Sequence, residues 1–222
     1  MQDSTSAEDP HARQPLLWGG SSLADARRAV ILVHGRGGSP EDILGLAKEL
    51  NVQDAAYLAP AAAGRTWYPL SFLAPIDQNE PAMSSALRML ARLVDMLTDQ
   101  GVAADRIMIL GFSQGACLGL EFAARNARRY AGVVGLSGGL IGPPGTPRDY
   151  AGTLAGTPVF LGCSDVDPHI PLARVHESAD VFRRLGAVVD EKIYPGMGHT
   201  INRDEINAVS ALLSRDSSDA VR

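Results

Sequence analysis

The sequence predicts an α/β fold in which a mainly parallel central sheet lies between helices. Short apolar runs of strand length alternate along the chain with longer segments of helical period, an order typical of parallel strands joined by helices. The apolar runs lack polar alternation, as expected of strands that are covered on both faces. With 222 residues, of which 45% are hydrophobic, the chain is long enough for one domain with a large core.

The first half of the chain contains two predicted strands and two predicted helices. In chain order we expect a strand over 29–33, a helix over 40–50, a strand over 55–60, an aromatic loop over 61–80 and a helix over 82–100. Ser39 is suited to cap the first helix, and Pro40 fits its first position because no N–H is needed there. In the second helix Leu90, Leu93 and Leu97 recur on one face.

The second half of the chain repeats this alternation. We expect strands over 106–111, 131–136, 158–162 and 188–194, and helices over 114–126, 172–185 and 202–213. Gly186 is placed to end the helix that precedes it, as glycine commonly does. In open parallel sheets ligands bind beyond the carboxyl ends of the strands. Functional residues are therefore expected directly after each strand.

Composition and charge limit the class of protein. The domain is predicted to span 16–213, with mobile tails over 1–15 and 214–222. A net charge of −5 argues against nucleic-acid binding. Glycines and prolines interrupt the longest uncharged stretch, so no membrane span is expected. Two cysteines, Cys117 and Cys163, are too few for a disulfide framework and lack zinc-site spacing, which favours a cytoplasmic protein without a bound metal.

Gly111-Phe-Ser-Gln-Gly115 is a GxSxG motif between a predicted strand and a predicted helix. In this setting the serine occupies a tight strand-to-helix turn that raises its hydroxyl above the sheet. The flanking glycines let strand and helix approach each other, and the first N–H groups of the helix point to where an oxyanion would form. Ser113 is therefore the candidate nucleophile. The alternative is that the motif is only a Gly/Ser-rich turn.

A serine nucleophile needs a base, and histidine is the usual one near neutral pH. His199 lies in a glycine-rich loop after the last predicted strand and fits the order serine, acid, histidine. The other histidines are less suitable: His11 falls in the N-terminal tail, His34 beside a turn, His169 close to an acid and His176 within a helix. For the acid we favour Asp167, because Pro168 fixes a turn beside it. Asp165, the other candidate, is assigned a loop-supporting role.

His34-Gly-Arg-Gly-Gly38 follows the first predicted strand and is similar to the loop that supplies one N–H to an oxyanion hole. We assign this donor to the backbone N–H of Arg36. The second donor is the backbone N–H of Gln114, the residue after the candidate nucleophile. A dinucleotide cradle is the rival interpretation, and Pro40 argues against it because GxGxxG requires a third glycine there.

These motifs, together with Asp165-Val-Asp-Pro-His-Ile-Pro171 and Pro195-Gly-Met-Gly-His199, resemble the phospholipase/carboxylesterase family of α/β-hydrolases. That family includes acyl-protein thioesterases, lysophospholipases and small bacterial carboxylesterases. The resemblance runs from about residue 29 to residue 213. It implies an α/β-hydrolase fold without a large lid domain and a catalytic triad of Ser113, Asp167 and His199. It further implies an oxyanion hole formed by the amides of Arg36 and Gln114.

The expected function is that of a cofactor-free serine carboxylesterase acting on small to medium acyl esters through an acyl-enzyme intermediate. A lysophospholipase or acyl-protein thioesterase of the same family is the alternative. Ser164, which stands where thioesterase members typically carry glycine, favours the esterase. A ligand-binding pseudo-hydrolase is the non-enzyme alternative. The expected partner is a small-molecule ester or thioester, and the oligomeric state is left open, with a homodimer among the options.

Aromatic side chains in the loop over 61–80 are candidates for the wall of a substrate pocket. They are Trp67, Tyr68 and Phe72. The alternative for these residues is that they cap the core. Met197 lies two residues before the candidate base and is a further candidate for substrate contact, although methionine often fills packing gaps.

Overall fold

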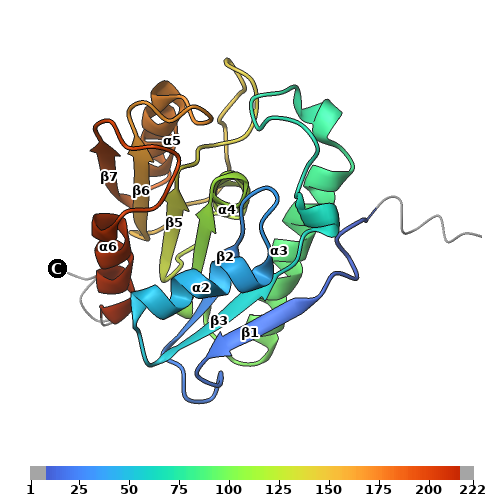
Figure 1. Cartoon of the computed structure of the whole chain (residues 1–222). Coiled ribbons are helices and arrows are strands. Elements are labelled where there is room, and N and C mark those ends of the chain that lie inside the picture. The colour runs from blue at the N-terminus through green and yellow to red at the C-terminus, as the bar shows by residue number, and fades with distance from the viewer. Residues whose placement is uncertain (1–8, 216–222) are drawn as a thin grey trace, which may run out of the picture.

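The computed structural model describes residues 9–215 as one seven-stranded sheet with helices on both faces (Figure 1). The strands are β1 (Leu16–Gly20), β2 (Arg28–Val33), β3 (Ala55–Pro60), β4 (Ile107–Phe112), β5 (Gly132–Leu136), β6 (Pro158–Ser164) and β7 (Val188–Tyr194). Their order is β1-β3-β2-β4-β5-β6-β7, with β1 antiparallel to β3 and all other pairs parallel. The α/β class expected from the sequence is confirmed. Residues 1–8 and 216–222, which belong to the predicted tails, lie outside the described residues.

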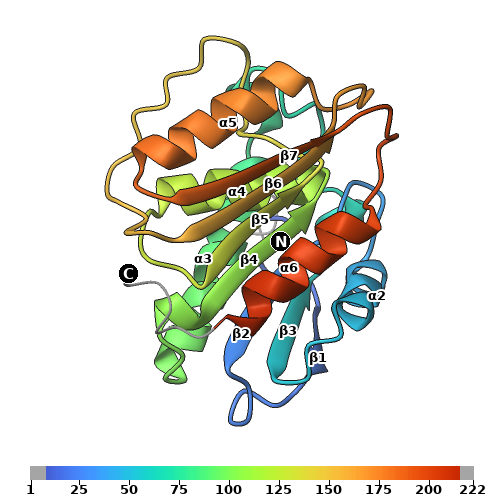
Figure 2. The same ribbon diagram turned by 90° about the vertical axis from the view of Figure 1, so that its left-hand side faces the viewer.

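The helices form one layer on each face of the sheet (Figure 2). They are α2 (Pro40–Leu50), α3 (Ala82–Asp99), α4 (Gln114–Arg125), α5 (Leu172–Arg184) and α6 (Arg203–Ser214). The buried side chains of α2 and α6 belong to one apolar cluster, and those of α3, α4 and α5 belong to a second cluster on the opposite face. Among the described residues, no helix has the length and apolar character that crossing a membrane requires.

Strand β2 shows why the predicted strands lack polar alternation. Val30 and Leu32 pack in the cluster with α2 and α6, whereas Ile31 and Val33 pack in the opposite cluster. Every residue of the strand is buried, because both faces are covered by helices. Val33 pairs with Gly111 of β4. The loops that follow β2 and β4 therefore begin side by side at one edge of the sheet.

Strand β1, which forms the edge of the sheet, is absent from the elements expected from the sequence. The segment Leu16–Gly20 is short and ends in two glycines, so it lacks the apolar run that identified the other strands. Its Trp18 pairs with Leu58 of β3. The loop expected over 61–80 also contains two short 3-10 helices, Ala63–Arg65 and Ile76–Asn79. These additions extend the predicted architecture without changing its class.

Within residues 9–15, which are expected to form part of a mobile tail, His11 packs against the domain. The His11 ring is 1% exposed and bridges two backbone groups of the aromatic loop. Its Nε2 lies 3.0 Å from the Trp67 carbonyl oxygen, and its Nδ1 accepts a hydrogen bond of 3.0 Å from the Ala63 N–H. The ring is therefore neutral, with its proton on Nε2. A single polar residue carries no periodic signal, so this contact could not be predicted from the sequence pattern.

The buried His11 ring predicts a pH dependence of stability. Burial lowers the pKa of His11 below its ordinary value of 6.5, although the hydrogen bond to Trp67 and the charge of Asp9 act against this. As the pH falls below 6.5, His11 is protonated in the unfolded chain before it is protonated in the folded protein. Its contribution therefore lowers the free energy of unfolding as the pH falls. We expect the free energy of unfolding of His11→Asn to vary less between about pH 7 and 5 than that of the wild type. Urea titrations of both proteins measure the difference, and equal pH slopes would contradict it.

Candidate active site

Ser113 occupies the turn between β4 and α4 with a backbone φ of 55° and ψ of −121°. A positive φ is unfavourable for serine, so the surrounding packing must hold it. A Cβ on Gly111 would lie 2.2 Å from the Gly115 carbonyl oxygen, and a Cβ on Gly115 would lie 2.1 Å from the Val33 carbonyl oxygen. The missing methyl groups let α4 approach the ends of β2 and β4. This approach fixes the turn on which the candidate nucleophile stands.

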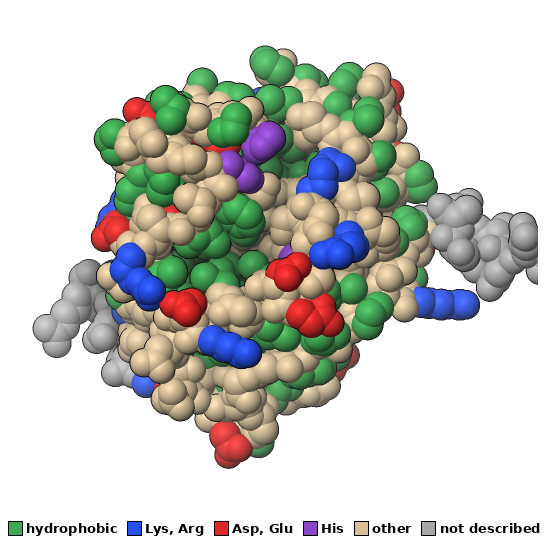
Figure 3. Space-filling model, viewed as in Figure 1, with side chains coloured by type: hydrophobic (Ala, Val, Ile, Leu, Met, Phe, Trp, Pro, Cys, Tyr) green, Lys and Arg blue, Asp and Glu red, His purple; other side chains and the backbone are tan. Residues whose placement is uncertain are grey.

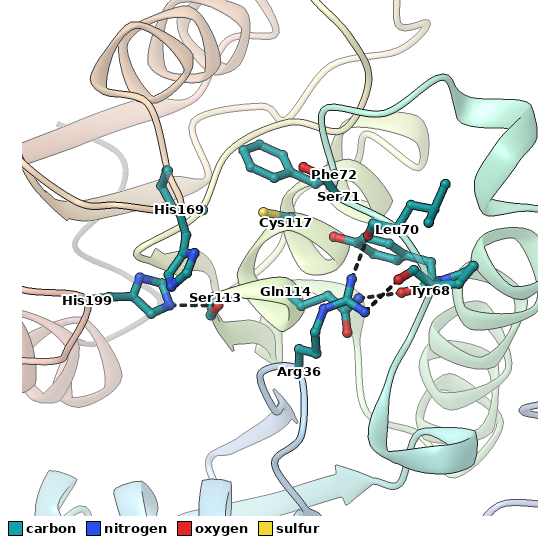
Figure 4. A pocket seen from close by; sticks show the side chains of 12 residues that line it. Arg36, Tyr68, Leu70, Ser71, Phe72, Ser113, Gln114, Cys117, His169 and His199 are labelled. Carbon is teal, nitrogen blue, oxygen red and sulfur yellow. Dashed lines mark hydrogen bonds between the residues drawn. The ribbon is translucent and has the colours of Figure 1, made fainter.

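His199 links the candidate nucleophile to the candidate acid. Its Nε2 lies 2.8 Å from Ser113 Oγ, and its Nδ1 lies 2.7 Å from Asp167 Oδ2 (Figure 4 draws the first contact). The three side chains come from the loops after β4, β6 and β7. Because Nδ1 faces a carboxylate, the ring proton belongs on Nδ1, and the lone pair of Nε2 faces the serine hydroxyl. In this arrangement His199 can accept a proton from Ser113.

Asp167 is held as a carboxylate in a buried position. Its side chain has no exposed surface, and its Oδ1 accepts hydrogen bonds from the N–H groups of His169 at 2.8 Å and Ile170 at 3.1 Å. Burial acts to raise the pKa of Asp167, but the hydrogen bonds from His199, His169 and Ile170 outweigh it and lower the pKa below the ordinary value. The carboxylate is therefore available to orient the imidazole.

Asp165 has a different position from Asp167. It is exposed, and its Oδ1 accepts a hydrogen bond of 2.8 Å from the Gly196 N–H. Its own N–H donates to the Tyr194 carbonyl oxygen at 3.3 Å. Asp165 thus joins the loop after β6 to the loop that carries His199 and makes no contact with the imidazole among those described. This placement agrees with a loop-supporting role.

The two backbone N–H groups assigned to the oxyanion hole belong to Arg36 and Gln114, and both residues line the same cavity as Ser113. The loop after β2 passes close to the serine, since a Cβ on Gly35 would lie 3.3 Å from Ser113 Cβ. The Ser113 side chain does not cap α4. The N–H groups in the first turn of α4 are thus not used by that hydroxyl.

The Gln114 side chain has a bracing role that no sequence motif indicates. This side chain is 6% exposed, and its Oε1 accepts hydrogen bonds from the Trp67 N–H at 2.9 Å and the Thr66 hydroxyl at 3.2 Å. Its Nε2 donates to the Tyr68 carbonyl oxygen at 2.7 Å. Gln114 therefore ties the turn of the nucleophile to the aromatic loop. No sequence signal separates such a glutamine from one that faces solvent.

A cavity of about 430 Å³ opens beside Ser113. Figure 3 views this face, with histidine side chains beside the hollow. Of the aromatic residues considered for a pocket wall, Tyr68 and Phe72 line the cavity. Met197 is absent from the lining, and its sulfur accepts a hydrogen bond from Asn202 Nδ2 at 3.1 Å. Residues for which the sequence raised no such expectation also contribute: Pro69, Leu70, Ser71, Cys117, His169 and Ile170.

Trp67 is placed in the core rather than in the cavity wall. Its side chain has no exposed surface, and its Nε1–H donates to the His34 carbonyl oxygen at 2.8 Å. The centroids of the His34 and Trp67 rings lie 4.8 Å apart. Both nitrogens of the His34 ring have partners: Nδ1 lies 2.8 Å from the Gly35 carbonyl oxygen, and Nε2 accepts a hydrogen bond of 3.1 Å from the Ala62 N–H. Burial lowers the pKa of His34. These two residues brace the loops around the cavity.

A family model described as Phospholipase/Carboxylesterase matches residues 21–216. The chain belongs to this family. The resemblance noted from the sequence motifs is thereby confirmed, and with it the α/β-hydrolase fold and the assignment of the chain as a hydrolase enzyme of the serine type.

Individual proteins agree with the family match. The crystal structure of a phospholipase/carboxylesterase from Dyadobacter fermentans superposes with a TM-score of 0.87 at 42% identity, covering 91% of this chain and 97% of that one. Acyl-protein thioesterase 1 of Saccharomyces cerevisiae is 26% identical over 89% of this chain and 96% of its own length. Acyl-protein thioesterase 1 of Gibberella zeae is 33% identical, over 55% of this chain and 53% of its own length.

The close approach at Gly115 can be tested against a matched glycine. Gly115→Ala introduces a methyl group at 2.1 Å from a backbone oxygen, so we expect a loss of stability of about 1–3 kcal/mol. At Gly45, inside α2, an added Cβ would meet no atom within 4 Å, so Gly45→Ala should gain about 0.5–1 kcal/mol. Urea unfolding measures both. Equal effects of the two substitutions would contradict tight packing at the turn.

Proposed function

We propose that the protein is a serine carboxylesterase that hydrolyses small to medium acyl esters through an acyl-enzyme intermediate. The observation that carries the proposal is the continuous hydrogen-bond chain from Ser113 through His199 to Asp167 beside a cavity. Membership of the phospholipase/carboxylesterase family supports it. The cavity volume of about 430 Å³ falls in the range of small-molecule sites, which supports acyl groups of small to medium length.

In the first half of the proposed reaction, His199 Nε2 takes the proton of Ser113 as its Oγ attacks the acyl carbonyl carbon. The carbonyl oxygen gains the negative charge and accepts hydrogen bonds from the backbone N–H groups of Arg36 and Gln114. Asp167 stabilises the imidazolium that forms. When the carbonyl re-forms, the alcohol leaves with the proton of His199, and the acyl group remains on Ser113.

In the second half of the reaction, water replaces the alcohol. His199 accepts a proton from water as the water oxygen attacks the acyl carbonyl, and the same N–H groups stabilise the second oxyanion. Ser113 leaves with the proton held by His199, and the carboxylic acid is released. Each step uses only protons and electron pairs of the ester, water and the three side chains.

An acyl-protein thioesterase or lysophospholipase is the second candidate. The fungal relatives named acyl-protein thioesterase 1 favour it. A thioester offers the same carbonyl carbon to Ser113, so the acyl length, rather than the chemistry of the triad, separates the candidates. A series of 4-nitrophenyl esters from acetate to palmitate, measured beside a thioester, decides between them. We also propose a cytoplasmic location, which the two buried, unpaired cysteines support.

Loss of the nucleophile tests the enzymatic proposal. We expect Ser113→Ala to lower kcat for 4-nitrophenyl butyrate by at least about 10³-fold, because only binding and the oxyanion donors remain. A fluorophosphonate probe should label the wild type and not the variant. Circular dichroism confirms that the variant is folded. Full turnover by folded Ser113→Ala would remove the proposal, and a wild type that neither turns over nor reacts with the probe would support a ligand-binding pseudo-hydrolase.

The two aspartates form a matched pair. Asp167→Asn replaces the carboxylate that faces His199 Nδ1, so we expect kcat to fall by about 10⁴-fold. Asp165→Asn keeps an oxygen that can accept from Gly196 and should cost less than about tenfold. Steady-state kinetics of the two variants give the ranking. The reverse ranking would assign the acid role to Asp165.

A further inference from the structure

The cavity beside Ser113 is lined by a permanent cation and by no carboxylate within residues 9–215. Arg36 supplies the cation. Tyr68 and Cys117 also line the cavity and stay neutral, because burial raises the pKa of Tyr68 well above its ordinary value and that of Cys117 to about 12. Asp167 lies behind His199 without exposed surface. A chain with a net charge of −5 thus presents a positive residue in the cavity that also holds its candidate nucleophile.

Neutral acceptors hold the Arg36 guanidinium in place. Its Nη1 donates to the Thr66 hydroxyl at 3.0 Å and to the Pro69 carbonyl oxygen at 2.8 Å, and its Nη2 donates to the Leu70 carbonyl oxygen at 2.5 Å. These bonds fix the group without neutralising its charge. Two of the five guanidinium N–H donors, one on Nε and one on Nη2, have no acceptor in the described part of the chain. Figure 4 shows the side chain reaching from its loop toward Tyr68 and Leu70, beside Gln114.

We propose that the Arg36 guanidinium binds an anionic oxygen group of the substrate, a carboxylate or a phosphate, so that the preferred esters carry a negative charge near the scissile bond. This inference rests on the proposed esterase function. The backbone N–H of the same residue is the assigned oxyanion donor, which places the guanidinium within one arginine side chain of the scissile carbonyl. The planar fork of N–H donors matches both anions. Because hydrogen bonds already fix the Arg36 side chain, it loses little conformational entropy when it binds either anion.

A purely structural role for Arg36 makes a different prediction. Its three hydrogen bonds also join the loop after β2 to the segment 66–70. If that were its only role, removing the guanidinium would disturb neutral and anionic esters equally. Recognition of charge instead changes the ratio of kcat/KM for the anionic ester to kcat/KM for the neutral ester. The ratio is therefore the quantity to measure.

The experiment compares pairs of esters in which methylation of one acidic group removes the negative charge. One pair is the 4-nitrophenyl ester of adipic acid with its second carboxyl free or methylated. The other is 4-butyryloxyphenyl phosphate and its dimethyl ester. Values of kcat/KM are measured for the wild type, Arg36→Met and Arg36→Lys. Arg184→Met, at the exposed end of α5, is the matched control because it removes the same formal charge away from the cavity.

We expect Arg36→Met to lower the charged-to-neutral ratio of kcat/KM by about tenfold or more, mainly through KM. Arg36→Lys keeps the charge without the fork and should fall between the wild type and Arg36→Met. Arg184→Met should leave the ratio unchanged. A response limited to one pair shows whether the site accepts a carboxylate on the acyl side or a phosphate on the alcohol side of the scissile bond.

Equal losses on both members of each pair in Arg36→Met, or an unchanged ratio, would overturn the inference and leave the esterase proposal standing. A wild type that hydrolyses no ester and does not react with the fluorophosphonate probe would overturn the esterase proposal, and this inference with it. The two failures are therefore distinguishable.

Discussion

The packing of α4 against the carboxyl ends of β2 and β4 is the constraint on which the site depends. Glycine at positions 111 and 115 permits a separation that a single methyl group would prevent. That separation fixes the backbone of Ser113 and places the loop after β2 beside it. Because the carboxyl ends of parallel strands meet at one edge, the loops after β6 and β7 bring Asp167 and His199 to the same edge as Ser113. His199 is 86 residues from Ser113 in the sequence.

Hydrogen bonds from side chains to backbone give these loops their fixed positions. Asp165 joins the acid loop to the histidine loop, Gln114 joins the serine turn to the aromatic loop, and His34 joins the first loop to residue Ala62. Each of these bonds gives a partner to a backbone N–H or carbonyl group of a loop that packing alone would leave without one. The geometry is thus present before any substrate binds, which is what stabilisation of a developing charge requires.

Local patterns account for the parts of the molecule that the sequence could predict. The GxSxG motif, the apolar strands and the glycine-rich loop before His199 each lie within a few residues, and each has a single physical explanation. The edge strand β1, the buried His11 and the Gln114 side chain depend on partners more than 30 residues away, and no periodicity records such contacts. Trp67 could not be placed for the same reason, because the sequence pattern around a tryptophan in a loop does not show whether its side chain caps the core or lines a cavity.

The contact between His11 and the aromatic loop joins the segment before β1 to the side of the molecule that carries the cavity. Trp67, whose carbonyl oxygen faces His11 across 56 residues of sequence, is the immediate neighbour of Tyr68 in the cavity wall. The position of one residue in the cavity wall therefore depends in part on a contact made outside the cavity. A substitution at His11 is therefore expected to be felt in the cavity wall, although the described hydrogen bonds of His11 reach neither Ser113 nor His199.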